Sequence, residues 1–279
     1  MADERASARR VVVTGASGGL GSAVARRFLK DGAQVVNLDR APPQADLAAN
    51  PKFSSIALDI SHEGMVREAF EEADRRFGRP GVDALVHCAA ISLAGTFPEI
   101  DTGAFDRVMA VNIRGTLLVC REAGRRMKAQ RRGHIVVVTS VCAEQAWVGE
   151  LAYSASKAAK RSLVQSMAND LAPFGVLVNA LGPGLIEQKS QDMVSSRDDP
   201  EIFKHDMDRT PLGRFGDPDE LAEAAHSLAA ATWMTGQTMY VDGGFLAAGL
   251  AHFGQGRARL LAPSSKSPNS QGVSARSSR

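Results

Sequence analysis

The sequence has little of several residue types, and each scarcity excludes a class of protein. It contains only three cysteines, Cys88, Cys120 and Cys142, without a CxxC spacing, which excludes a disulfide scaffold and a cysteine-rich zinc site. Aromatic residues make up 5% of the chain, so a nucleic-acid platform of stacking rings is not expected. No apolar run approaches the length of about 18 residues that a membrane span needs, and no signal-peptide pattern opens the chain. We therefore expect a protein of the reducing cytoplasm with no membrane or nucleic-acid partner.

The chain also lacks a strong charge of one sign, with 33 basic and 31 acidic residues. Residues 251–279 hold five basic residues and no acidic one, so the rest of the chain has no positive excess and no general field for DNA or anionic lipid. This serine-rich, aperiodic segment is predicted to be a disordered tail. The six histidines show no metal-ligand spacing, so we expect no metal site.

Short β-branched runs alternate with longer helical stretches from residue 10 to about residue 242. The run His134–Val138 is apolar after its first residue, which is typical of a parallel strand buried on both faces. Strands are predicted at residues 11–14, 34–38, 53–58, 83–87, 134–139, 176–180 and 238–241, and helices at 20–31, 63–76, 103–129, 151–171 and 217–230. This alternation predicts an α/β fold, a doubly wound parallel sheet with helices on both faces, in one domain over residues 1–250. The polar stretch 186–212 is predicted to form a mobile flap or a short-helix excursion at the substrate site.

A glycine-rich turn, TGASGGLG over residues 14–21, follows the first predicted strand and opens a helix. Glycine lets the backbone approach a pyrophosphate closely, while the helix N-terminus offers free N–H groups and a positive dipole end. A tight loop without a ligand is the alternative for this motif alone. The candidate cofactor residues of the turn are Gly15, Ser17, Gly18, Gly19, Leu20 and Gly21.

Asp39 ends the second predicted strand, 18 residues after Gly21. A carboxylate at this place can accept hydrogen bonds from an adenosine ribose, although turn and capping aspartates are also common there. A 2′-phosphate would bring about two negative charges against it, so Asp39 predicts NAD rather than NADP. Arg40 follows directly, either as a solvated partner of an acid or as a contact for a phosphate. Asp59 and Ile60, after the third strand, are candidates to flank the adenine.

Ser140 ends the fifth predicted strand, and Tyr153 and Lys157 follow it on a predicted helix. Residues four apart lie on one helix face, where an ammonium beside a phenol favours the phenolate. We therefore expect Lys157 to lower the pKa of Tyr153, making it a general base for an alcohol proton. Ser140 would orient the substrate oxygen. A surface pair is the alternative for Tyr-x-x-x-Lys taken alone.

These motifs, together with VNIRG (residues 111–115), Pro183-Gly184 and VDGG (241–244), resemble the short-chain dehydrogenase/reductase family in their order along residues 10–247. The resemblance implies a Rossmann-type sheet of seven strands and a homo-oligomer, either a tetramer or a dimer. It implies a catalytic set of Asn112, Ser140, Tyr153 and Lys157, in which Lys157 also bonds the nicotinamide ribose and Asn112 holds a relay water. From the residues alone, Asn112 is a polar residue in an apolar helical run, and a satisfied buried amide is the alternative.

The resemblance also implies cofactor contacts from two loops, Cys88-Ala89-Ala90 and Pro183-Gly184 with Ile186. The first loop departs from the family's usual Asn-Asn-Ala-Gly, because His87-Cys88-Ala89-Ala90 stands there. Cys88 supplies no amide, so its cofactor contact is expected from the backbone. His87 is predicted to be structural. Trp147, Cys142 and Glu150 are candidates to line the substrate pocket, with core packing as the alternative for Trp147.

The sequence thus predicts an oxidoreductase that transfers a hydride between NAD and a small secondary alcohol or ketone, with Tyr153 as the acid/base. One alternative is an NADP-dependent carbonyl or 3-oxoacyl-thioester reductase. Another, from a different class, is a dinucleotide sensor without catalysis. The presence of Asn112, Ser140, Tyr153 and Lys157 weighs against the sensor.

Overall fold

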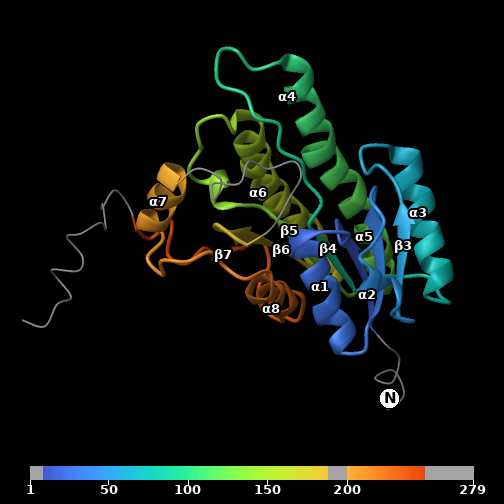
Figure 1. Ribbon diagram of the computed structural model, residues 1–279. Helices are drawn as coiled ribbons and strands as arrows, with labels where there is room; N and C mark the ends of the chain where they lie inside the picture. The colour runs from blue at the N-terminus through green and yellow to red at the C-terminus, as the bar shows by residue number, and fades with distance from the viewer. Residues whose placement is uncertain (1–8, 188–199, 249–279) are drawn as a thin grey trace, which may run out of the picture.

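The computed structural model describes residues 9–187 and 200–248, and within them seven parallel strands form one sheet (Figure 1). The strands run in the order β3-β2-β1-β4-β5-β6-β7. Their bounds are β1 Arg10–Thr14, β2 Gln34–Asp39, β3 Phe53–Ala57, β4 Ala84–His87, β5 Gly133–Val138, β6 Val176–Pro183 and β7 Thr238–Val241. The predicted α/β fold and all seven predicted strands are confirmed.

Helices connect these strands and cover both faces of the sheet (Figure 1). Their bounds are α1 Gly19–Lys30, α2 Ala45–Ala48, α3 Glu63–Arg76, α4 Thr102–Met109, α5 Thr116–Gln130, α6 Leu151–Leu171, α7 Pro200–Arg209 and α8 Pro218–Ala229. Helix α2 was not predicted from the sequence, because it is too short to show an apolar period. Helix α7 lies within the stretch 186–212, for which the sequence predicts a mobile flap or a short-helix excursion.

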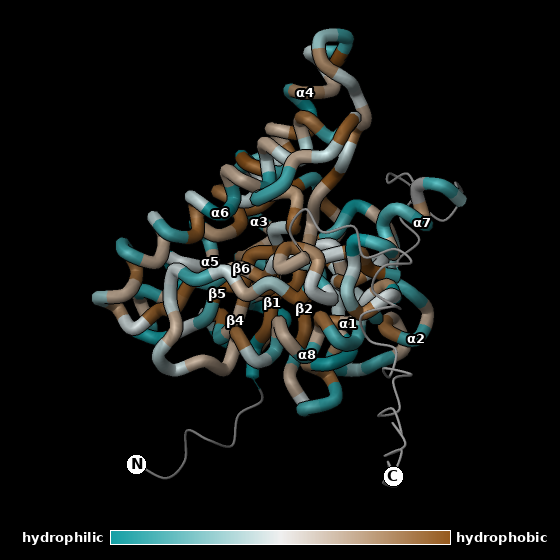
Figure 2. Tube along the Cα trace, turned by 90° about the vertical axis from the view of Figure 1, so that its left-hand side faces the viewer, coloured by the Kyte–Doolittle hydropathy of each residue, from teal (hydrophilic) through white to brown (hydrophobic). Residues whose placement is uncertain are grey.

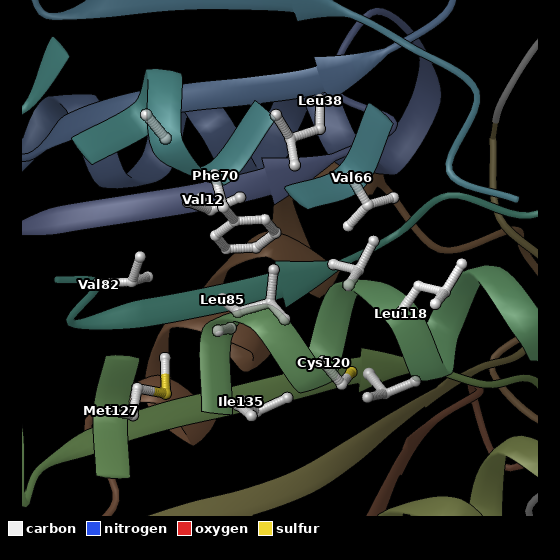
Figure 3. Packing of buried hydrophobic residues seen from close by; sticks show 14 of the residues in the cluster. Val12, Leu38, Val66, Phe70, Val82, Leu85, Leu118, Cys120, Met127 and Ile135 are labelled. Carbon is white, nitrogen blue, oxygen red and sulfur yellow. The ribbon is translucent and has the colours of Figure 1, made fainter. Parts of the chain in front are cut away.

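Alternate residues of the central strands point to opposite faces of the sheet and belong to two separate hydrophobic cores. Val12 and Leu85 point to the face covered by α3 and α5, where they join Phe70 of α3 (Figure 3). Val11 and Val13 point to the other face, which α1 and α8 cover. Figure 2 shows the central strands largely in the brown of apolar residues. Burial on both faces explains why these strands are apolar throughout rather than alternating.

The order of the strands reverses between β1 and β4, which makes this the switch point of the sheet. Strand β1 pairs with β2 on one side and with β4 on the other, so the chain winds outward in opposite directions from these two strands. Ligands of open α/β sheets bind at such a switch point, outside the carboxyl ends of the strands. The glycine turn after β1 and the loop after β4 both lie at this end of the sheet.

The helical stretch predicted over residues 103–129 is confirmed, but it is not α-helical throughout. Helix α4 and helix α5 are separated by a π-helical segment, Ala110–Gly115, which includes Asn112. Hydrophobic periodicity did not indicate the break, because one wide turn keeps the helix axis continuous. Residues 188–199 of the predicted flap and the predicted tail 251–279 lie outside the described residues, so both remain predictions.

Candidate active site

The turn after β1 requires glycine at defined positions. Gly15 and Gly19 have positive φ angles of 75° and 45°, which side chains disfavour. A Cβ atom on Gly21 would stand 2.1 Å from the carbonyl oxygen of Gly15. A Cβ atom on Gly15 would stand 3.0 Å from the backbone nitrogen of Ala89, in the loop after β4. The backbone of the turn therefore packs closely on itself and on its neighbour.

The N-terminus of α1 begins in this turn. Gly18 is its N-cap, and because it has no side chain no cap hydrogen bond is formed; the first turn holds no acidic residue. The early N–H groups and the positive end of the helix dipole therefore face the turn without an acidic side chain from the first turn of α1. This chemistry, with the close-packed glycine backbone, fits the pyrophosphate of a dinucleotide.

Asp39 at the end of β2 lies beside the same turn. One carboxylate oxygen, Oδ2, accepts a hydrogen bond from the Ser17 backbone at 3.0 Å, and Oδ1 accepts one from the Ala41 backbone at 3.0 Å. The side chain of Ser17 in turn donates to the Ala41 carbonyl at 2.8 Å. These bonds fix the carboxylate at the rim of the glycine turn, where an adenosine ribose would lie in this fold.

Asp59 and Arg40 influence each other from the neighbouring strand ends. Burial opposes ionisation of Asp59, but hydrogen bonds from the Ser61 backbone and hydroxyl, with the charges of His62 and Arg40, hold the pKa of its carboxyl below the ordinary value. Arg40 itself is exposed. Ile60, next to Asp59, is buried and stands close enough to Gly115 that a Cβ atom there would be 2.9 Å from its side chain.

The loop after β4 is held through its backbone. The Cys88 N–H donates to the Thr14 carbonyl at 3.2 Å, and the Ala89 N–H donates to the Thr14 hydroxyl at 3.1 Å. His87 is fully buried, with one ring nitrogen bonded to Thr14 and the other to Thr116, both at 2.9 Å. Burial keeps the pKa of His87 well below its ordinary value, so it is a neutral structural residue, as the sequence predicted.

The segment after β6 completes this edge of the sheet. Pro183 ends β6, and the Gly184 N–H donates to the Val241 carbonyl at 3.0 Å. A Cβ atom on Gly184 would stand 2.6 Å from Cα of Asp242, so glycine is required there. Ile186 forms an isolated parallel bridge with Gly216.

Ser140, Tyr153 and Lys157 come together, as the sequence predicted. Ser140 follows β5, and its side chain acts on the Tyr153 phenol in the direction that lowers the pKa of the phenol. The Ser140 hydroxyl also accepts from the Cys142 backbone at 3.1 Å, which caps a short 3₁₀ turn and fixes the serine rotamer. Lys157 is 2% exposed; its ammonium lies 5.0 Å from the centre of the Tyr153 ring and donates to the Val138 carbonyl at 3.2 Å.

The electrostatics of this group differ from the prediction. Burial raises the pKa of Tyr153 above its ordinary value, and interactions with Cys142 and Glu150 act in the same direction, while the interaction with the Ser140 side chain opposes them. Burial also lowers the pKa of Lys157 to about 8. The expected lowering of the phenol's pKa is therefore wrong for the protein alone, because desolvation outweighs the favourable interactions.

Comparison with known proteins decides the family. A family model described as enoyl-(acyl carrier protein) reductase matches residues 15–246. A 3-oxoacyl-(acyl-carrier-protein) reductase from Aquifex aeolicus is 34% identical over 242 residues, which cover 84% of this chain and 95% of the relative. The chain belongs to the short-chain dehydrogenase/reductase family. It is thus an oxidoreductase acting on CH–OH groups, in a family that uses NAD or NADP.

Two further relatives of this short-chain dehydrogenase/reductase are named as dehydrogenases of a sugar and of a sugar acid. A glucose 1-dehydrogenase from Gluconobacter oxydans is 36% identical, over 86% of this chain and 93% of the relative. The crystal structure of a gluconate 5-dehydrogenase from Burkholderia cenocepacia, in complex with NADP and tartrate, superposes with a TM-score of 0.80. That structure is 32% identical and covers 86% of this chain, with 95% of its own chain covered.

Asn112, in the π-helical segment of this short-chain dehydrogenase/reductase, is fully buried. Its amide nitrogen donates to the Ile91 carbonyl and to the Ser156 hydroxyl, both at 2.9 Å, and its oxygen accepts from the Ile91 N–H at 2.9 Å. The amide thus holds the chain after β4. This is the arrangement expected from the alternative in which Asn112 is a buried amide with all its hydrogen bonds satisfied. Its role in holding a relay water stays a prediction.

Sequence reasoning missed Lys160, which lies on the same face of α6 as Tyr153 and Lys157. Its side chain is fully buried, and its amine donates to the Ala89 carbonyl at 3.3 Å. The signal was present: residues 153, 157 and 160 follow the i, i+4, i+7 spacing of one helix face. Because this spacing puts Lys160 on the same helix face as Lys157, it predicts that both lysines lie at the site rather than in solvent.

A cavity of about 570 Å³ opens next to the segment that carries Tyr153. Two predicted pocket residues, Cys142 and Trp147, line it, and Trp147 also packs on Phe245 with ring centres 5.8 Å apart. The third, Glu150, bonds the buried Ser92 hydroxyl. Across residues 9–187 and 200–248, no helix is long and apolar enough to cross a membrane, and no cluster of possible ligands could hold a metal ion.

Proposed function

We propose that this short-chain dehydrogenase/reductase is an NAD-dependent dehydrogenase of small secondary alcohols, working reversibly on the matching ketones. The observation that carries the proposal is the convergence of Ser140, Tyr153 and Lys157 at the end of β5, on the same edge of the sheet as the glycine turn. The family membership supports it, since the family's relatives oxidise or reduce CH–OH and carbonyl groups.

The proposed chemistry divides between the cofactor and the side chains. A bound nicotinamide dinucleotide supplies the hydride acceptor or donor. Ser140 donates a hydrogen bond to the substrate oxygen, and the Tyr153 hydroxyl exchanges the proton with that oxygen. Because the pKa of Tyr153 is raised, the hydroxyl is protonated at neutral pH and ready to act as an acid toward a ketone. Oxidation needs the phenolate, so its rate is expected to rise as the pH increases.

Lys157 supports this chemistry by its charge and by its hydrogen bonds. With a pKa of about 8, its amine is mostly protonated at neutral pH and stabilises a developing phenolate. One proton is anchored on the Val138 carbonyl, which leaves two for the nicotinamide ribose expected in this family.

The proposed preference for NAD rests on Asp39. Its carboxylate is fixed at the rim of the glycine turn by the backbones of Ser17 and Ala41. The two charges of a 2′-phosphate beside it cost several kcal/mol at an effective dielectric of about 20. We expect NAD to be favoured by at least about 100-fold in kcat/KM.

The test is kcat/KM with NAD and with NADP for the wild type and Asp39→Ser. The variant is expected to relax or invert the preference, because the exposed Arg40 can then pair with the phosphate. Asp46→Ser is a matched control: this exposed aspartate pairs with Arg26 and stands away from the turn. A wild type that prefers NADP, or an unchanged ratio in Asp39→Ser, would reject the role of Asp39.

A second candidate is an NADP-dependent carbonyl or 3-oxoacyl-thioester reductase. It is favoured by the similar gluconate 5-dehydrogenase solved with NADP and by the Aquifex relative named as a 3-oxoacyl reductase. Absorbance of the reduced nicotinamide, followed over sugars, polyols, hydroxy acids, steroids, cyclic alcohols and a 3-oxoacyl thioester, decides between the two. Dinucleotide binding without turnover of any of these substrates would instead support a sensor.

We propose further that the enzyme is a cytoplasmic homo-oligomer, a tetramer or a dimer. Membership of the short-chain dehydrogenase/reductase family supports this oligomeric state, because the resemblance to the family implies a tetramer or a dimer. Light scattering coupled to size-exclusion chromatography measures the mass directly, and a monomer at working concentration would reject this part of the proposal.

A further inference from the structure

Lys160 is a fully buried lysine that the proposed chemistry does not use. It lies two turns along α6 from Tyr153 and one turn from Lys157. Its exposed fraction is 0%, and its amine donates a 3.3 Å hydrogen bond to the carbonyl oxygen of Ala89. A lysine in the core lowers the stability of the folded protein unless its amine has a strong partner, because its charge must be desolvated. A buried lysine without such a partner is therefore a candidate for a functional role.

The surroundings of Lys160 offer no acidic partner among the groups that act on it. The titratable groups facing it are Lys157 on its own helix, Cys88 and His87 at the end of β4, and Cys120 on α5. Burial, followed by the charge of Lys157, holds the pKa of Lys160 well below its ordinary value. Burial therefore favours the uncharged form of Lys160 more than water does for a free lysine, and the contact that the structure shows for its amine is the hydrogen bond it donates to Ala89.

The carbonyl that Lys160 binds belongs to the wall of the dinucleotide site. The Ala89 N–H is held by the Thr14 hydroxyl at 3.1 Å, and the Ala89 backbone stands against Gly15 at the start of the glycine turn. Two residues further, both backbone groups of Ile91 are held by Asn112. Side chains from β1, α6 and the π-helical segment thus hold every backbone polar group of Ala89 and Ile91.

We propose that Lys160 is a positioning residue that fixes the Ala89 peptide, and through it the wall of the dinucleotide site against the glycine turn. The inference rests on the proposed dinucleotide binding. An apolar side chain would fill the same space at less cost to folding, so the amine is retained for the hydrogen bond. Its effect is on cofactor affinity rather than on the proton transfer at Tyr153.

The first test is Lys160→Met, which keeps the length of the side chain and removes the donor. Titration of the purified protein with NADH, followed by nicotinamide fluorescence, is expected to show binding about five- to tenfold weaker, the size of one lost buried hydrogen bond. KM for the dinucleotide should rise by the same factor while kcat stays within about twofold. Lys128→Met, at an exposed lysine on α5, is the matched control and should bind as the wild type does.

The second test separates positioning from general damage to the fold. An amine whose pKa is lower in the folded than in the unfolded protein makes stability rise with pH between those two pKa values, up to the pKa of free lysine at about 10.4. Lys160→Met lacks this dependence, so its melting temperature should exceed that of the wild type at neutral pH, with a gap that narrows toward alkaline pH. Weaker binding in a more stable protein is the expected signature.

Lys160→Gln, which keeps an uncharged N–H donor, should recover part of the affinity that Lys160→Met loses. Binding by Lys160→Met that equals the wild type, or a loss of affinity that Lys160→Gln fails to reduce, would overturn the inference. If the wild type itself binds neither NADH nor NADPH, the proposed function fails, and the inference fails with it.

Discussion

The cofactor turn and the catalytic face of α6 lie on the same edge of the sheet but are built from different material. The turn from Thr14 to Gly21 is almost all backbone: close-packed glycines and the open N-terminus of α1. The face of α6 is built from side chains: the half-buried Tyr153, and the buried Lys157 and Lys160, whose amines are anchored on carbonyls of β5 and of the loop after β4.

The difference decides what can go wrong in each region. A backbone site depends on distances, so one added methyl group is enough to close it. A site made of titratable side chains depends on whether their charged forms are stabilised without water. Burial therefore strongly influences the pKa values of Tyr153 and the two lysines. The three predictions below test this contrast, beginning with the largest expected effect.

Tyr153→Phe removes one hydroxyl from the side-chain site and should lower kcat by about 10²–10⁴-fold, the usual contribution of general acid–base catalysis. Dinucleotide affinity should change little, since the backbone turn is untouched. Steady-state kinetics and NADH titration measure the two quantities separately. Tyr240→Phe is the matched control, because it removes a hydroxyl of the same kind, which bonds Glu144. Near-normal kcat in Tyr153→Phe would show that another group transfers the proton.

Gly21→Ala adds one methyl group to the backbone site. The new Cβ atom would stand 2.1 Å from the Gly15 carbonyl oxygen and 3.0 Å from Cα of Ala16, so the turn must open. Overpacking of this kind costs about 1–3 kcal/mol, and we expect dinucleotide affinity to fall by about 10- to 100-fold.

Gly64→Ala is the control for Gly21→Ala, because a Cβ atom on Gly64 meets nothing within 4 Å. Gly64 lies in the first turn of α3, where alanine should raise stability by about 0.5–1 kcal/mol without an effect on binding. Equal affinity in Gly21→Ala and the wild type, measured by the same NADH titration, would contradict the account of the turn.

Glu150→Gln tests how charge sets the pKa of Tyr153, with the smallest expected effect. The Glu150 carboxylate helps raise that pKa, so the neutral amide should lower it and increase the phenolate fraction at a given pH. The pH–rate profile for alcohol oxidation should move to lower pH, with a gain of about two- to fivefold on its rising limb, the effect of one partly screened charge. Glu144→Gln, at the other acid of the 141–150 segment, should leave the profile in place. A profile unmoved by Glu150→Gln would mean that desolvation alone controls the phenol.

The sequence predicted the backbone site better than the side-chain site, for physical reasons. Strand patterns and glycine spacing obey local steric rules, so the sheet and the turn follow from residues such as Val12, Gly15 and Gly21. The grouping of Ser140, Tyr153 and Lys157 was likewise predicted from strand ends and helix spacing. The pKa of Tyr153 was not, because its direction depends on burial by distant segments, which no local pattern reports. The π-helical segment at Asn112 left no signal because the helix axis stays continuous, whereas the i, i+4, i+7 spacing of residues 153, 157 and 160 did indicate that Lys160 shares the face of Tyr153 and Lys157.

The π-helical segment Ala110–Gly115 has a consequence for the spacing of the chain. A wide turn accommodates one more residue than an α-helical path between the same ends. Deleting one residue from the segment would restore regular α-helix between the same two ends, so α4 and α5 would keep their places while the residues inside the segment would lose the wide turn that sets their positions. Asn112 would swing away from Ile91, and the loop after β4 would lose its clamp. The length of this segment is therefore as strictly constrained as the identity of Asn112, so its tolerance of insertions and deletions should be far lower than its tolerance of substitutions.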